Sequence, residues 1–141
     1  SHDGRQVYQT LRWLNGALVI DIASRKIVDR IALGETKFAS EGKDAHGIAV
    51  TPDGKELWIA TQTTDDVTIL STGDHRVLGQ VQVGRDPNWL EFTPDSKLAV
   101  RSNTGSGDVS IVDVATRRTI KTVKVGKAPK RLTVGLAEVA P

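Results

Sequence analysis

The sequence predicts an all-β fold, an incomplete β-propeller ring of about three four-stranded blades. Three sequence markers recur along the 141 residues at the same two spacings, 50 and then 42 residues. Each repeat holds four short segments rich in β-branched residues, and no segment keeps a helical period. Self-similarity of this length is typical of propeller blades.

The three markers define the repeat boundaries. The first is a strand ending, IALG, VQVG and VKVG, which closes at Gly34, Gly84 and Gly126. The second is a turn, SHDG, TPDG and TPDS, which begins at Ser1, Thr51 and Thr93. The third is a strand, VIDI, ILST and IVDV, which contains Asp21, Ser71 and Asp113. Residues 35–42 account for the longer first spacing, and we expect them to form a long loop between blades.

The second repeat shows the four expected strands most clearly. They are HGIAVTP, ELWIATQ, DVTILST and RVLGQVQV, which begin at His46, Glu56, Asp66 and Arg76. Turn-forming residues such as Pro52 to Gly54 separate them. In the third repeat the fourth strand carries Lys121 and Lys124, which is typical of an exposed outer edge.

The repeat alignment also assigns structural roles. We call equivalent positions of the aligned repeats a slot. Tyr8 and Trp58 share one strand slot, which predicts that both pack between neighbouring blades. His75 shares a turn slot with Arg25 and Arg117, so we expect its role to be structural as well.

The boundaries divide the chain into four parts. Residues 1–34 form strands two to four of the first blade, 35–84 the second blade with its inserted loop, 85–126 the third blade, and 127–141 an inner strand, RLTVG, of a further or split blade. The first blade is therefore divided between the two ends of the chain. Propellers close with roughly 4 to 8 blades, so we expect a longer chain or a homo-oligomeric ring to supply the rest. The missing methionine at position 1 favours a longer chain.

Composition excludes several classes of protein. The chain has no cysteine, which excludes disulfides, thiolate metal sites and thiol nucleophiles. No run approaches the roughly 18 apolar residues of a transmembrane helix. The net charge is only +2, and we assign the seven basic residues between Arg117 and Arg131 to an outer edge and its turns, so we expect no nucleic-acid partner.

The motifs resemble the YVTN-type β-propeller repeats of bacteria and archaea. The resemblance rests on AHGIAVTPDGKELWIAT from Ala45, DVSIVDVATRRTI from Asp108 and the closing VKVG, and it extends over nearly the whole chain. It implies an exported protein, whether periplasmic, secreted or on the cell surface. Similar repeats occur beside or within haem d1 and quinoprotein propellers, so the resemblance implies a location more firmly than an activity.

Sequence templates for catalysis and metal binding do not match. There is no pair of histidines at i and i+4, no calcium-binding loop and no glycine-rich loop before a helix. We therefore predict no catalytic residue, no metal and no cofactor, and favour a protein that is not an enzyme.

Residues at the start of each innermost strand are the candidates for ligand binding, because propeller side chains approach the central channel there. His46 aligns with Asn88 and Lys130, three different polar groups, and Trp89 aligns with Gly47 and Arg131. Solvated loop positions for the polar groups, and blade packing for Trp89, are the structural alternatives. The predicted ligand-binding residues are Asp44, His46, Asp86, Asn88, Trp89, Lys130 and Arg131.

The function predicted from these features is a non-catalytic module that binds a protein or small ligand at the channel face. Two alternatives remain at this point. The chain could belong to a haem d1-like or quinoprotein-like redox propeller in which His46 faces a cofactor, or it could be a structural component of a surface layer.

Overall fold

The computed structural model describes residues 1–11, 13–34 and 45–135. These residues form eleven strands in three antiparallel sheets and no helix, which confirms the predicted all-β fold. It follows that the described ranges contain no helix long and apolar enough to cross a membrane. The predicted loop 35–42 lies outside the described residues.

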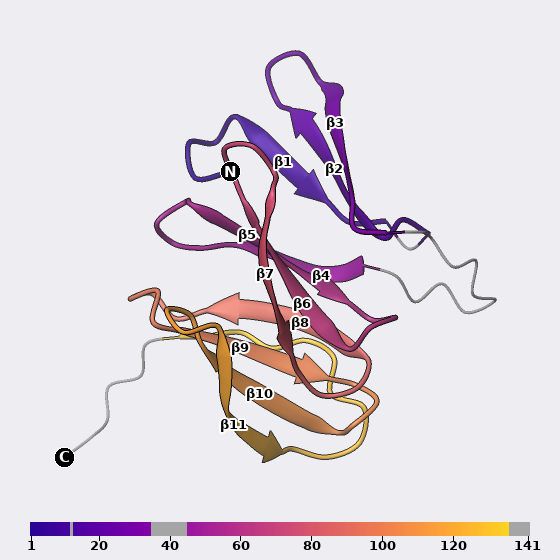
Figure 1. Cartoon of the computed structure of the whole chain (residues 1–141), viewed down its shortest axis with the longest axis vertical. Helices are drawn as coiled ribbons and strands as arrows, with labels where there is room; N and C mark the ends of the chain where they lie inside the picture. Colours follow the sequence, from indigo (N-terminus) through magenta and orange to yellow (C-terminus); the bar gives the residue numbers. More distant parts are fainter. Residues whose placement is uncertain (12, 35–44, 136–141) are drawn as a thin grey trace.

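Each sheet corresponds to one predicted blade (Figure 1). Blade 1 consists of β1 (Gln6–Gln9), β2 (Gly16–Asp21) and β3 (Lys26–Ala32). Blade 2 consists of β4 (Ala45–Val50), β5 (Glu56–Thr61), β6 (Asp66–Ser71) and β7 (Val77–Gln82). Blade 3 consists of β8 (Pro87–Phe92), β9 (Leu98–Asn103), β10 (Asp108–Asp113) and β11 (Arg118–Lys124). Strands that follow each other in the chain are neighbours in each sheet, and blade 2 lies between the other two.

Equivalent turns shape the blades in the same way. The Thr51 hydroxyl accepts a hydrogen bond from the Glu56 amide at 3.0 Å, and Thr93 does the same for Leu98 at 3.0 Å. These bonds hold the turn that follows each inner strand, where aspartate, glycine and serine are the favoured residues. The recurrent TPDG and TPDS motifs therefore encode a repeated turn.

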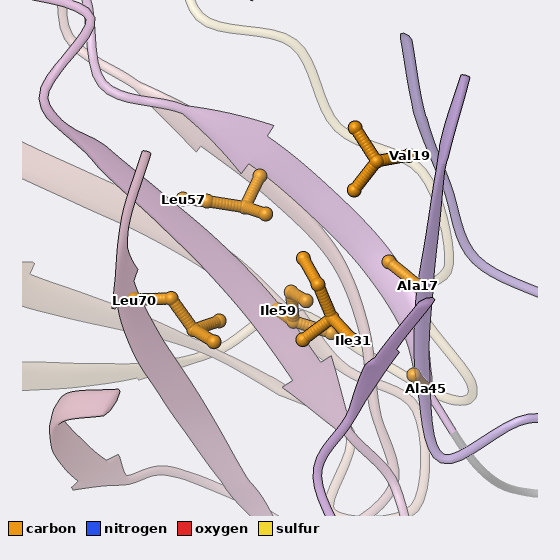
Figure 2. Close-up of a cluster of buried hydrophobic side chains, with 7 residues drawn as sticks. All are labelled: Ala17, Val19, Ile31, Ala45, Leu57, Ile59 and Leu70. Atoms are coloured by element: carbon orange, nitrogen blue, oxygen red, sulfur yellow. The ribbon is translucent and has the colours of Figure 1, made fainter. Parts of the chain in front are cut away.

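Blades 1 and 2 pack through an apolar layer. Ala17, Val19 and Ile31 of blade 1 meet Leu57, Ile59 and Leu70 of blade 2 (Figure 2). All six side chains are at most 5% exposed. Because side chains alternate between the two faces of a strand, this layer uses one face of blade 2 and leaves the other for blade 3.

Trp58 occupies the other face of blade 2. It is fully buried in a second layer with Leu90, Ala99 and Val112 of blade 3. Its ring meets Phe92 edge to face, with centroids 5.2 Å apart. Trp58 therefore packs between blades, as its strand slot predicts.

Polar contacts also tie neighbouring blades together, near the turn between the third and fourth strands. His75 Nδ1 of blade 2 lies 2.8 Å from Asp29 Oδ2 of blade 1. Arg117 has the same place in blade 3, where it donates hydrogen bonds to Glu56 Oε1 at 2.7 Å and to the main-chain oxygen of Leu78 at 2.8 Å. We call the contacts made by His75 and Arg117 interblade clasps.

One charged side chain is buried between blades 2 and 3. Arg101 on β9 is 0% exposed, and its three guanidinium nitrogens have no hydrogen-bond partner among the described residues. Burial lowers the pKa of Arg101 to about 9, although the negative charge of Asp66 acts in the opposite direction, so the guanidinium is still charged at neutral pH. The repeat alignment puts Arg101 in the slot of Ile59 in blade 2. Blade 3 therefore buries a cation at a position where blade 2 buries an apolar side chain.

We expect Arg101→Met to raise the free energy of unfolding by about 1–3 kcal/mol, because methionine fills a similar volume and removes a buried group that has no hydrogen-bond partner among the described residues. Urea unfolding at pH 7 measures the change. The matched control is Ile59→Met in the equivalent slot, where one apolar side chain replaces another and the loss should stay below about 1.5 kcal/mol. A clear loss of stability in Arg101→Met would contradict this account.

Asp108 anchors the turn between β9 and β10. Its side chain is 6% exposed and accepts hydrogen bonds from Asn103 Nδ2 and Ser106 Oγ, each at 2.8 Å, and from Lys124 Nζ at 3.1 Å. Burial raises the pKa of Asp108, but these hydrogen bonds and the Lys124 charge outweigh it and hold the pKa below its ordinary value. The carboxylate is therefore ionised at neutral pH and joins β9, its turn and β11.

The lowered pKa makes the stability that Asp108 supplies depend on pH. This contribution is fully present above the unfolded-state pKa of about 3.9 and is lost as the pH falls through the lower folded-state pKa. Asp108→Asn should reduce the free energy of unfolding by about 1–3 kcal/mol at pH 7. Urea unfolding of both proteins from pH 7 to pH 3 should show this difference shrinking below about pH 4. An equal difference at both ends of the range would disprove the assignment.

Candidate functional site

The candidate site is a cleft of about 800 Å³ at one end of the three blades. Antiparallel pairing puts the start of each inner strand beside the end of the second strand, as Ala45 pairs with Thr61 and Pro87 with Asn103. The inner strands β4 and β8 also lie against each other. Residues 8–11, at and after the end of β1, complete the lining, so all three blades contribute to the cleft.

Each inner strand starts with a β-bulge that faces this end. The pairing register shifts within residues 45–48 of β4 and within residues 87–90 of β8. Bulges interrupt the ladder and re-aim side chains, and they are common beside functional sites. His46 lies in the first bulge, and Asn88 and Trp89 lie in the second. Three predicted site residues therefore occupy equivalent irregular positions.

Gly47 lets the two inner strands approach closely. A Cβ atom at Gly47 would overlap the main-chain oxygen of Asn88 and would lie 3.1 Å from the Cα atom of Trp89. On the other side, the Thr10 hydroxyl donates a 2.7 Å hydrogen bond to the main-chain oxygen of His46. The start of β4 is therefore fixed against blade 3 by packing and against blade 1 by a hydrogen bond.

Asp86 brings a carboxylate group to the cleft lining. Its backbone has a φ of 53°, its amide donates to Asp65 Oδ1 at 2.7 Å, and its carbonyl accepts from the Thr104 amide at 2.9 Å. Asp86 lines the cleft, and its buried Oδ1 atom has no hydrogen-bond partner in the part of the chain that the structure describes. A carboxylate group in the lining favours a ligand with a hydroxyl or N–H donor.

Trp89 offers an aromatic surface. Its amide donates to Ser102 Oγ at 3.1 Å, and its indole Nε1 donates to Glu91 Oε1 at 3.1 Å. The Arg131 guanidinium lies 5.5 Å from the ring centroid, which is a cation–π distance. The ring is therefore held in place from its main chain and from its polar edge.

The segment that follows β11 lies against blade 3 beside the cleft. Ser102 Oγ donates to the main-chain oxygen of Lys130, and Thr104 Oγ1 donates to that of Pro129 at 2.8 Å. Residues 127–135 belong to no strand, so the predicted inner strand RLTVG has no partner strand among the described residues. Its pairing stays a prediction.

Most of the predicted ligand-binding residues lie together in this cleft. The lining includes His46, Asp86, Asn88, Trp89 and Lys130. Arg131 stands over Trp89 at its margin. Asp44 lies outside the described residues. Their meeting is a structural fact, whereas ligand binding by them stays a prediction.

The cleft is also lined by residues that the sequence did not mark as site residues, namely Tyr8, Gln9, Thr10, Gln62 and Thr104. Gln62 and Thr104 share one repeat slot directly after the second strand, so the alignment contained a signal for them. The residues of blade 1 had no such signal, because their position depends on how blade 1 packs on blade 2.

The lining is suited to hydrogen bonding. It offers amides, a carboxylate, an imidazole and an ammonium group around the aromatic surface of Trp89. The Thr10 and Thr104 hydroxyls both donate to main-chain oxygens, so they help to hold the cleft in shape. Among the described residues no group of three or more His, Cys, Asp or Glu could hold a metal ion.

We expect Gly47→Ala to force the inner strands apart and to lower the free energy of unfolding by about 1–3 kcal/mol, because the obstructing atoms are main-chain atoms. Thermal unfolding measures the loss. Gly73→Ala is the matched control, since a Cβ atom there would meet only Ser71 Oγ at 3.7 Å. Equal stability of the two variants would contradict the close approach.

Solved structures share this fold at low sequence identity. The chain is similar to the hydrazine synthase of Kuenenia stuttgartiensis, with 19% identity and a TM-score of 0.80 over 92% of this chain and 36% of that chain. It is similar to the periplasmic gluconolactonase PpgL of Pseudomonas aeruginosa, with 20% identity and a TM-score of 0.75 over 93% and 39% of the two chains. It is also similar to the dihydro-heme d1 dehydrogenase NirN in complex with DHE, with 16% identity and a TM-score of 0.67 over 88% and 26%.

These similarities show a β-propeller-type fold. No protein-family model matches the sequence, and no curated protein sequence does. The resemblance to YVTN repeats therefore rests on the motifs of the chain alone. The chain spans between 26% and 39% of the length of the three structures named above.

Proposed function

We propose that this chain is a non-catalytic, ligand-binding part of an exported β-propeller, and that it binds a small polar molecule in the cleft. The observation that carries the proposal is the combination of the Asp86 carboxylate group and the aromatic surface of Trp89 in the lining of one 800 Å³ cleft. Aromatic walls with a few convergent polar groups are typical of small-molecule sites.

The charges around the cleft indicate the chemistry of the ligand. Lys130 and Arg131 are exposed near its margin and favour an anionic group. Asp86 inside the cleft favours a hydroxyl donor, and the face of Trp89 favours a ring or an apolar face. A hydroxylated organic acid combines these properties. The similar protein PpgL is named a gluconolactonase, so gluconate is a suitable first probe.

An exported location is supported by two independent features. The YVTN-like motifs resemble repeats of exported proteins, and one similar structure is named a periplasmic protein.

Calorimetric titration with gluconate and with 6-phosphogluconate tests the proposed function. Asp86→Asn should weaken binding about tenfold or more, since a hydrogen bond to a charged group contributes roughly 1.5–3 kcal/mol. Trp89→Ala should also weaken binding, because it removes the aromatic surface of the cleft. Lys130→Ala should weaken binding, whereas Lys121→Ala, a lysine exposed on β11, should not. Binding that none of the cleft variants alters, or no binding of either acid, would contradict the proposal.

His46 favours a second candidate, a redox propeller. Its imidazole lines the cleft and is exposed, and NirN was solved in complex with DHE. Titration with haemin would then give a shifted Soret band that is lost in His46→Ala and retained in His75→Ala. A spectrum identical to that of free haemin would exclude this candidate.

A further inference from the structure

Blade 1 has a second apolar face, which points away from blade 2. Tyr8 and Val19 pair across β1 and β2 and pack toward blade 2. Val7 and Ile20 are the next pair along the same strands, so alternation places them on the opposite face. Val7 is 42% exposed.

The same face of blade 2 is fully covered. The slots of Val7 and Ile20 are occupied in blade 2 by Leu57 and Leu70, which also pair with each other. Leu57 is 0% exposed and Leu70 is 1% exposed, because blade 1 packs on them (Figure 2). By position in the repeat, the open face of blade 1 is therefore the face on which another blade packs.

Arg25 occupies the clasp slot on blade 1. Arg25, His75 and Arg117 share the turn slot and a positive φ of 57°, 55° and 53°. His75 and Arg117 each reach the blade that precedes theirs. Arg25 is exposed and forms no hydrogen bond or ion pair with any residue in the ranges described. Blade 1 thus has both the apolar face and the clasp residue for a preceding blade.

Two slots on the partner blade determine what a clasp residue meets. In blade 1, His75 meets Asp29 on β3. In blade 2 the position equivalent to Asp29 is Gly79. Arg117 lies beside this glycine, with its Nη1 atom 3.5 Å from the place where a Cβ atom would stand. Glu56, at a second position of the repeat, supplies the carboxylate that Arg117 contacts. Both observed clasps therefore end on an acidic side chain.

Blade 3 differs from this pattern. It holds Lys121 in the slot of Asp29 and Leu98 in the slot of Glu56. If a second copy of the chain placed its blade 3 on blade 1, Arg25 would face a lysine and find no carboxylate in either slot. Like charges repel, so Arg25 would oppose this association.

We propose that the face formed by Val7 and Ile20 binds a further four-stranded blade that carries a carboxylate in the slot of Asp29 or Glu56, and that a second copy of this chain is not the partner. Apolar burial provides the contact, and Arg25 selects among blades by charge. This inference is independent of what the cleft binds.

A fusion in repeat register tests the proposal. A second copy of residues 45–92 is joined directly before Ser1, which stands in the slot of Thr93. The added segment supplies a preceding blade that carries Glu56. Its last strand, a copy of β8, becomes the inner strand beside β1. In this fusion Arg25→Ala should lower the thermal midpoint by about 2–4 °C, the shift expected for roughly 1 kcal/mol in a chain of this size.

A matched fusion isolates the charge effect. In it the added segment carries Glu56→Leu and Gly79→Lys, the residues of blade 3 in those slots. There Arg25→Ala should leave the midpoint unchanged or raise it. An Arg25→Ala effect that is the same in both fusions would overturn the proposed selection by charge.

Sedimentation of the unfused chain provides a test that does not depend on folding of the fusions. Lys121→Glu places a carboxylate in the acceptor slot of blade 3 and should strengthen head-to-tail association at least several-fold. Adding Arg25→Glu to this variant should abolish the gain. Stable association of the unchanged chain that Val7→Asp abolishes would show that copies do pair through this face and would overturn the proposal.

Discussion

Face-to-face packing of sheets that are apolar on both faces is the constraint on which this structure depends. Blade 2 buries Leu57 and Leu70 on one side and Trp58 on the other, and neither face can be buried without a neighbouring blade. The close contact of β4 with β8 follows from this packing. The cleft does too, since its walls belong to three different blades. The buried core and the cleft are thus properties of the stacked blades and belong to no single repeat.

Polar groups between the blades then distinguish one interface from the next. The interface of blades 1 and 2 is closed by His75 and Asp29, and that of blades 2 and 3 by Arg117 and Glu56. Arg101 is a different case, because its charge is buried without a hydrogen-bond partner among the described residues. Apolar layers therefore hold the blades together, and the polar contacts differ from one interface to the next.

Much of the fold was predictable, because the repeat appears in the sequence three times. Each marker identified a turn or a strand ending, and the shared slot of Tyr8 and Trp58 identified interblade packing. The bulges at His46 and Asn88 and the buried acceptor of Asp86 were not predictable, since they arise from pairing register and from loop contacts. Likewise, the alignment named the turn slot of His75 but could not show which blade its side chain contacts.

One position of the repeat, occupied by Gly47, Trp89 and Arg131 in turn, makes the cleft asymmetric. Gly47 has no side chain, which lets the two inner strands meet. Trp89 presents an indole at the equivalent position, and Arg131 presents a cation that stacks on that indole. A ring of identical repeats would present the same side chain at every step and would accept a ligand in several equivalent rotations. Here the repeat symmetry is broken where the blades converge, so the three equivalent positions offer three different kinds of contact.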